Sequence, residues 1–169
     1  MIILRTMLVA SVLALLTVTP VQAASQSEIE EAISVLKSSS GGLVERFSDS
    51  EVKQMLVSAG YKSVRVIDDG KLRFKVGEQV FVLYIHEDGD MHLYFGSTGL
   101  AISYEDINEW NRTTRLSRAY LDDDDDIAIE TDLLANAGIN QTMVLEMVKV
   151  FVETSVPRFL DFVRENDRS

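Results

Sequence analysis

The stretch that decides the fold is Lys-Leu-Arg-Phe-Lys-Val at residues 71–76. Apolar and basic side chains alternate through it, which is typical of a β-strand with one face buried and the other in contact with solvent. Turn-forming residues flank this strand, namely Asp68-Asp69-Gly70 before it and Gly77-Glu78 after it. A third turn, Asp88-Gly89-Asp90, follows the next apolar run. The spacing predicts an antiparallel meander of four strands, near residues 64–67, 71–76, 79–86 and 91–95.

The register of this meander follows from matching the faces of its strands, because a slip of one residue would turn a strand over. Three-residue loops at the first and third turns and a two-residue loop at Gly77-Glu78 collect one apolar set on one face. In this register His86 and His92 lie directly opposite each other on the other face. The predicted core face consists of Val64, Val66, Leu72, Phe74, Phe81, Leu83, Ile85, Leu93 and Phe95.

Two helices are marked by capping residues on either side of the meander. Ser48 followed by Glu51 is the pattern of a capping box. Gly60 is placed to close that helix in the left-handed conformation. Ser103 caps the second helix, which contains Trp110. The meander is therefore predicted to lie between two short helices in the chain.

Two more strands are predicted near residues 115–121 and 127–133, and a long helix follows them. Asn140 caps that helix, which reaches about Arg164 and contains Pro157, a residue expected to kink it. The helix carries two apolar stripes, so one can pack on the sheet and the other requires a second partner, expected to be another subunit. These patterns predict an α+β fold, an antiparallel sheet with packing helices.

Residues 1–23 have the composition of a secretory signal peptide. Arg5 precedes an apolar run, and Val21-Gln22-Ala23 supplies small residues before a cleavage point. An uncleaved membrane anchor is the alternative, and it is disfavoured because the run is shorter than the roughly 20 apolar residues that span a bilayer. Cleavage after Ala23 predicts a periplasmic or secreted protein without stable membrane insertion.

The remaining chain is expected to hold one folded domain, as its length of 169 residues suggests. Residues 24–47 are predicted to contain a short amphipathic helix at 27–37 and a Ser/Gly linker at 38–42. Residues 48–166 are predicted to form the domain itself.

Composition excludes several classes of function. Lys and Arg total 16 against 27 Asp and Glu, a formal charge of -11, so nucleic acids and anionic membranes are disfavoured as partners. The chain has no cysteine, which excludes disulfides, thiol nucleophiles and thiolate metal sites. It also lacks the Gly-x-Ser-x-Gly elbow and the glycine-rich phosphate loops. These absences predict a non-enzymatic protein with no cofactor.

Five consecutive aspartates, Asp122 to Asp126, join the last two predicted strands. A Ca²⁺ loop needs a glycine at its sixth position and a bidentate glutamate at its twelfth. Counted from Asp122, those positions hold Ile127 and Leu133. The run is therefore interpreted as a solvated hairpin turn. Weak binding of a divalent cation and contact with a partner are the alternatives.

The chain has two histidines, His86 and His92. Two imidazoles on neighbouring strands could share a metal, but a zinc site needs three or four ligands and no third ligand is evident. The residues beside them are too apolar for a face left in contact with water, which indicates a protein contact. These apolar neighbours are Val80, Val82, Tyr84 and Tyr94.

The second half of the chain contains three notable segments: Asn108-Glu109-Trp110-Asn111-Arg112, then Arg115 with Arg118-Ala119-Tyr120-Leu121-Asp122, and finally Glu130 with Asp132-Leu133. In this order they resemble the YbjN family of bacterial proteins. The similarity extends to Ala59-Gly60-Tyr61 and the aromatic-rich final helix, so it covers roughly residues 48–165. It implies a fold like that of the type III secretion chaperones, often dimeric, with three strands between the first two helices. Members are described as sensory transduction regulators without established catalytic residues, so no active site is carried over.

The family segments supply three cations to an acidic protein: Arg112, Arg115 and Arg118. Bidentate pairs with carboxylates could lock the second helix to the following hairpin. Recognition of an acidic partner segment and, last, catalysis are the alternatives. The candidate carboxylates are Glu109, Glu130 and Asp132.

These inferences converge on an exported, non-enzymatic, protein-binding regulatory module that is chaperone-like and homodimeric. The alternative is an envelope sensor that binds a small ligand or a divalent metal. The predicted partner-binding residues are Val80, Val82, Tyr84, Tyr94, Trp110, Arg112, Arg115 and Arg118. The less favoured metal ligands are His86, His92, Asp122, Asp124 and Asp126.

Overall fold

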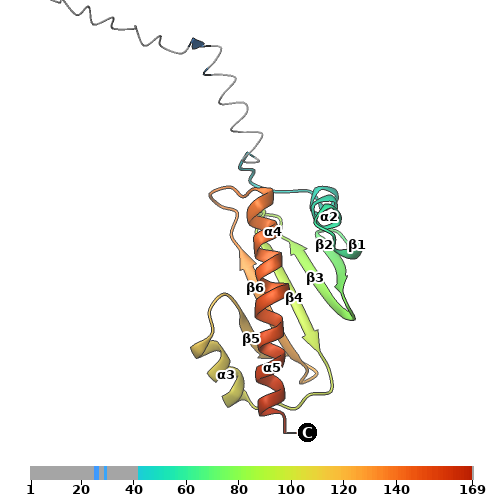
Figure 1. The fold of residues 1–169 in the computed structure, drawn as a ribbon, viewed down its shortest axis with the longest axis vertical. Helices are drawn as coiled ribbons and strands as arrows, with labels where there is room; N and C mark the ends of the chain where they lie inside the picture. The colour runs from blue at the N-terminus through green and yellow to red at the C-terminus, as the bar shows by residue number, and fades with distance from the viewer. Residues whose placement is uncertain (1–24, 27–28, 30–41, 169) are drawn as a thin grey trace, which may run out of the picture.

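The computed structural model describes residues 25–26, 29 and 42–168, and it shows the predicted α+β fold (Figure 1). Within these ranges a layer of helices packs on a six-stranded antiparallel sheet of order β1-β2-β3-β4-β6-β5. The helices are α2 (Asp49–Ser58), α3 (Tyr104–Thr113), α4 (Gln141–Val150) and α5 (Val156–Asn166). The strands are β1 (Lys62–Asp68), β2 (Lys71–Val76), β3 (Gln79–Ile85), β4 (Met91–Ser97), β5 (Arg118–Leu121) and β6 (Ile127–Leu133).

The N-terminal predictions fall largely on residues outside these ranges. This applies to the signal peptide at 1–23, to most of the amphipathic helix at 27–37 and to most of the linker at 38–42. None of the helices among the described residues is both long and apolar enough to cross a membrane.

The four-stranded meander is confirmed, with one strand more than the family resemblance implies. Val76 pairs with Gln79 across the predicted two-residue turn, and Val66 pairs with Leu72 as a three-residue first loop requires. One strand prediction was too long, because residues 115–117 are not part of β5. Leu116 adopts a φ of 66° there, which is incompatible with a strand.

The register between β3 and β4 differs from the predicted one by two residues. Tyr84 pairs with His92, so His86 and His92 are not directly opposite each other as predicted. The reason is a turn placed one residue earlier in the chain, in which the N–H of His86 donates to the carbonyl of Asp90 at 2.9 Å. Gly89 makes this turn possible, because its φ of 91° lies in the left-handed region. A shift of two residues leaves each side chain on its predicted face.

The predicted core face is buried beneath the helices with one exception. Val66 faces the same side as its partner Leu72, yet it is 43% exposed. It lies on the edge strand β1, where a surface hollow beside the first turn of α2 leaves it uncovered. The buried members are Val64, Leu72, Phe74, Phe81, Leu83, Ile85, Leu93 and Phe95.

The helix starts are confirmed by their caps. Ser48 and Ser103 each form a capping box, and the Asn140 side chain accepts from the N–H of Met143. Pro157 lies in the first turn of α5, and the helical chain continues through it. A π-helical turn, η1 (Phe151–Ser155), precedes it, and Figure 1 shows α4 and α5 continuing each other in front of the sheet.

Candidate functional site

The side of the sheet that faces away from the helices is the candidate functional site, and we call it the open face. Strand alternation places every second side chain there, because Phe81, Leu83 and Ile85 are buried against the helix layer. The apolar residues between them are only half-buried. The open face comprises Lys71, Arg73, Lys75, Val80, Val82, Tyr84, His92, Tyr94, Gly96, Arg118, Tyr120, Ala128, Glu130 and Asp132.

The register arranges these side chains in rows across the sheet. One row runs from Arg73 through Val82, Tyr94 and Glu130 to Arg118. A second row runs from Lys71 through Tyr84 and His92 to Asp132. Four predicted partner-binding residues, Val80, Val82, Tyr84 and Tyr94, therefore share one surface.

A buried glutamate, Glu130, lies in the first row between Tyr94 and Arg118. Glu130 is 4% exposed, and its carboxylate accepts hydrogen bonds from Nε of Arg118 and from the Tyr120 hydroxyl, the latter at 3.2 Å. Nε2 of His92 lies 2.6 Å from the same carboxylate. Arg118 also lies 3.7 Å from Asp132. These contacts satisfy a charge that would otherwise be costly to bury.

Two tyrosines cover this buried charge, and their surroundings oppose ionisation. Burial and the nearby Glu130 carboxylate raise the pKa of Tyr120 to about 12. Burial, followed by the carboxylate of Asp122, raises the pKa of Tyr94 above its ordinary value. Both phenols therefore remain neutral hydrogen-bonding groups at physiological pH.

An aromatic stack extends along the second row. The Lys71 ammonium lies 5.0 Å from the centre of the Tyr84 ring, a cation–π contact. The rings of Tyr84 and His92 stack with centroids 5.1 Å apart, and those of His92 and His86 with centroids 6.3 Å apart. His92 is thus held between two rings, and His86 ends the stack at an exposed position. Among the described residues, no group of three or more His, Cys, Asp or Glu could hold a metal ion.

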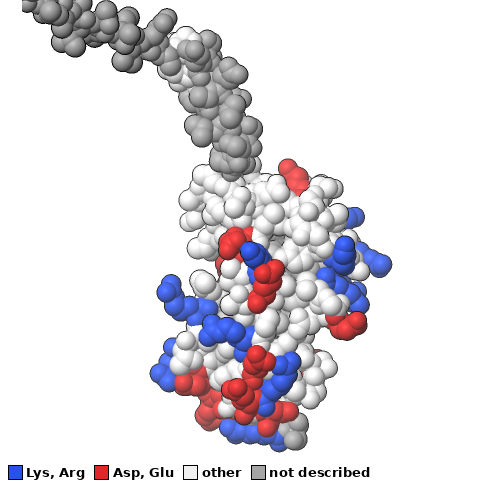
Figure 2. Space-filling model, viewed as in Figure 1, with Lys and Arg blue, Asp and Glu red and all other residues white. Residues whose placement is uncertain are grey.

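The open face has opposite charges at its two ends. Lys71, Arg73 and Lys75 lie on β2, next to Arg65 of the edge strand β1. Figure 2, which views the molecule from the helix side, shows blue side chains along its β1–β2 edge, and the open face lies on the far side of this view. Asp132 and the aspartate turn lie at the other end, beyond the half-buried valines and tyrosines. The surface thus runs from a basic edge through an apolar centre to an acidic end, where Arg118 of β5 is paired with Glu130 and Asp132.

The aspartate run forms the tight hairpin turn that the sequence predicted. The N–H of Asp122 donates to the carbonyl of Asp126 at 2.9 Å. Oδ1 of Asp122 accepts from the N–H groups of Asp124 and Asp126, each at 3.0 Å. One carboxylate therefore holds the backbone of the turn, while Asp123, Asp124 and Asp125 are exposed.

The remaining predicted partner-binding residues include three that lie away from the open face. Trp110 is buried in the core, where its ring packs 5.1 Å from Phe159, so it presents no surface to a partner. Arg112 pairs with Glu109 of its own helix at 2.7 Å. Arg115 is exposed and makes no ion pair with another described residue.

The prediction that arginines lock helix to hairpin is wrong, although two of the arginines do pair with predicted carboxylates. Arg118 pairs within the β5–β6 hairpin, and Arg112 within α3. The link between these elements is Asn111, whose side-chain amide donates to the Ala119 carbonyl at 2.9 Å and accepts from the Ala119 N–H at 2.8 Å. Its position inside a family segment was the signal that could have identified it.

Two small residues shape the open face and were not recognised from the sequence. A Cβ at Gly96 would overlap the hydroxyl of Tyr94, so the absence of a side chain lets this ring lie across the strand. Ala128, opposite Gly96 on β6, is fully buried. A glycine within an apolar strand is the sequence signal for such a close approach.

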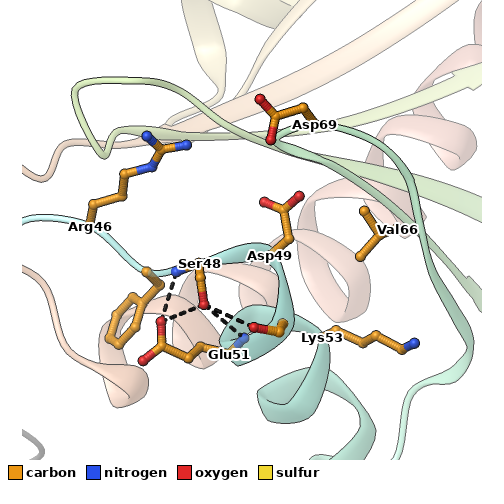
Figure 3. Close-up of a pocket in the computed structure, with 9 residues that line it drawn as sticks. Arg46, Ser48, Asp49, Glu51, Lys53, Val66 and Asp69 are labelled. Carbon is orange, nitrogen blue, oxygen red and sulfur yellow. Dashed lines mark hydrogen bonds between the residues drawn. The ribbon is translucent and has the colours of Figure 1, made fainter.

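A polar hollow of about 700 Å³ lies at the start of α2, away from the open face. Figure 3 shows Arg46 and Lys53 on its rim with three carboxylates. Two of these carboxylates have structural partners: Glu51 completes the capping box, and Asp49 accepts from the N–H of Gly70 at 3.1 Å. These carboxylates therefore have structural roles: Glu51 caps α2, and Asp49 ties α2 to the β1–β2 turn.

Comparison with known proteins identifies the family. The sequence profile described as "YbjN: Putative bacterial sensory transduction regulator" matches residues 48–163. No curated protein matches the chain. The crystal structure of YbjN from E. coli, "a putative transcription regulator", superposes with a TM-score of 0.54 at 16% identity, covering 73% of this chain and 93% of that one.

A second solved structure is the Yersinia pestis type III secretion chaperone SycH in complex with a stable fragment of YscM2. Its TM-score is 0.49 at 16% identity, with 64% of this chain and 97% of that chain covered. The fold is thus shared with YbjN from E. coli, and the sequence profile spans most of the folded region. This chain belongs to the YbjN family.

Proposed function

We propose that the protein is an exported, non-enzymatic regulatory module that acts by binding proteins, and that its open face joins two copies into a homodimer. The observation that carries this proposal is the polarised open face: half-buried valines and tyrosines between a basic edge and an acidic edge. Apolar surface of this kind on a folded domain usually marks a protein contact.

The charge pattern fits a second copy because it is self-complementary. In a twofold arrangement each residue contacts a different residue of the partner, and the reverse contact is repeated. Two open faces packed with their rows antiparallel would bring Lys71 of one copy to Asp132 of the other, and Tyr84 to His92. The apolar centres would meet in the middle. Each contact removes apolar area from water, and the charged ends fix the orientation.

The dimer is tested by sedimentation equilibrium of the chain without residues 1–23. Wild type is expected at twice the monomer mass. Val82→Glu, which puts a charge in the apolar centre, is expected to weaken the dimer at least about tenfold. Val57→Glu is the matched control, since Val57 is exposed on α2 and its replacement leaves the dimer intact. A monomer at all concentrations, or a Val82→Glu variant as dimeric as wild type, would refute the interface.

A charge-swap cycle tests the orientation of the two copies. Lys71→Asp and Asp132→Lys each place like charges together and should each weaken the dimer. The double variant restores opposite charges and should recover a large part of the loss. Additive weakening in the double variant contradicts the antiparallel arrangement.

Export rests on the composition of residues 1–23. Expression of the full chain in a bacterial host, followed by mass measurement of the periplasmic fraction, tests it. The expected product begins at Ala24. Full-length protein confined to the cytoplasm would contradict export and leave the dimer measurement unaffected.

A further inference from the structure

An apolar groove of about 420 Å³ lies on the helix side of the sheet, between α4 and the end of β6. Thr131 and Leu133 of β6 form its floor, and Met143 and Met147 of α4 form one wall. Figure 2 shows uncharged surface at the top of α4 and a group of red and blue side chains farther down it. The groove is separate from the open face, because the side chains of Thr131 and Leu133 point to the other side of the sheet.

Leu116 forms the opposite lip of the groove in an unusual conformation. It is 67% exposed and has a φ of 66°, in the left-handed region that favours glycine. Met143, on the facing wall, is 39% exposed. A strained backbone that holds a large apolar side chain in water is not explained by packing within this subunit.

The groove borders an unpaired strand edge. β5 pairs with β6 from Ile127 to Glu130, whereas β4 pairs with β6 along its whole length to Leu133. The chain before Arg118 does not pair with β6, because it turns away at Leu116. Over 131–133 no described strand therefore covers the outer side of β6. Such an edge is a template for pairing with another segment.

We propose that this groove binds an extended segment of another protein, which adds to the outer edge of β6 as an additional strand. Backbone hydrogen bonds would provide the pairing, and alternate side chains would enter the groove. The residues opposite Thr131 and Leu133 face α4 and must be apolar, since they meet Met143 and Met147. This inference deepens the proposed function, because it names the chemistry of a bound partner.

The charge of Asp132 determines which residue of the bound segment fits between its two apolar residues. The residue opposite Asp132 points to the open side, next to a carboxylate that is 47% exposed and 3.7 Å from Arg118. Glu146 lines the groove on the helix side, away from this position, so the basic residue is set by Asp132 alone. A basic residue fits between the two apolar ones, so the recognised pattern is apolar, Lys or Arg, apolar. A second copy fits less well, because edge-to-edge pairing of β6 would bring Asp132 near its own counterpart.

The test uses three fluorescein-labelled peptides of alternating Thr and Val with Leu-Lys-Leu, Leu-Glu-Leu or Leu-Pro-Leu at the centre. Fluorescence anisotropy measures binding to the chain without residues 1–23. The Lys peptide is expected to bind about threefold more tightly than the Glu peptide, and the Pro peptide at least about tenfold more weakly than either. Hydrogen exchange is expected to show protection of the amides at residues 131–134 only with the first two peptides.

Variants assign the binding to the groove. Met143→Glu should weaken binding of the Lys peptide at least about tenfold, and Leu116→Gly should weaken it while preserving the turn. Asp132→Lys should reverse the preference between the Lys and Glu peptides. Val82→Glu is the matched control: it disrupts the proposed dimer and should not weaken peptide binding, so failure of one interface is separable from failure of the other.

Equal binding of the Pro peptide, or binding without protection at residues 131–134, would overturn strand addition. The absence of binding by any peptide to protein with an intact circular dichroism spectrum would also overturn it. A dimer that Met143→Glu abolishes and Val82→Glu leaves intact would show that the groove is occupied by a second copy, which contradicts both proposed interfaces.

Discussion

Replacing Arg118 by leucine tests whether the buried Glu130 charge organises the open face. The guanidinium of Arg118 is the positively charged donor to this carboxylate, and the two residues pair directly across β5 and β6. Leucine preserves the apolar stem of the side chain and removes the charge. The variant leaves Glu130 with the Tyr120 hydroxyl at 3.2 Å and with His92.

The expected loss of stability is about 2 kcal/mol, within the range for hydrogen bonds to charged groups. Such bonds contribute about 1.5–3 kcal/mol, and loss of one partner from a fully buried ion pair costs about 3–5 kcal/mol. The lower range applies, because the Arg118 side chain is 62% exposed. Water can therefore replace part of its interaction. For a domain of this size, the loss corresponds to a fall in Tm of roughly 6 °C.

Urea unfolding monitored by Trp110 fluorescence measures this loss, since the single tryptophan is buried beside Phe159 and Phe162. Arg112→Leu is the matched control, because its pair with Glu109 is exposed on both sides. A change in the free energy of unfolding below about 0.5 kcal/mol is expected for a surface pair of this kind.

A double-mutant cycle assigns the loss to the ion pair. In a Glu130→Gln background the Arg118→Leu change should cost less than about 0.5 kcal/mol, because no buried charge remains to be stranded. An equal loss in both backgrounds would show that Arg118 stabilises the sheet through packing of its stem, and the electrostatic reasoning would be wrong.

Three further predictions follow from single side chains. Asn111 satisfies both polar groups of the Ala119 backbone. Asn111→Ala should therefore destabilise the domain by about 2 kcal/mol in urea unfolding, because two hydrogen bonds are lost. Tyr120 should ionise near pH 12 in an ultraviolet absorbance titration, and Tyr120→Phe should remove that component. Since the unfolded chain releases this proton near pH 10, stability should fall between about pH 10 and 12, and less so in the variant. Leu116→Gly should raise the free energy of unfolding by about 0.5–1 kcal/mol, because glycine adopts the left-handed conformation without strain.

The elements that were predicted well are those encoded by local chemistry. Ser48, Ser103 and Asn140 cap their helices through atoms a few residues away. The alternation at 71–76 and the turn at Gly77-Glu78 determine a register that needs no distant information. Such features depend on the backbone and its nearest neighbours, which the sequence displays directly.

The errors arise where distant segments decide the outcome. The pattern places Val66 on the core face, and it does face that way, but coverage depends on where α2 begins relative to the edge strand. Asn111 was overlooked because its partners on Ala119 lie across a loop whose course the pattern does not reveal. Leu116 was included in the strand predicted near residues 115–121, and the groove it borders could not be anticipated while that strand was assumed to continue.

The two proposed surfaces are linked through Asp132. Its side chain stands at the acidic end of the open face and also lines the groove at the unpaired edge of β6. In the dimer it would pair with Lys71 of the second copy, and in the groove complex with the basic residue of the bound segment. One carboxylate shared by two cations interacts with each less strongly, so the two binding events should oppose each other. Because coupling between sites is reciprocal, a bound segment should loosen the dimer by the same factor by which dimerisation weakens its own binding.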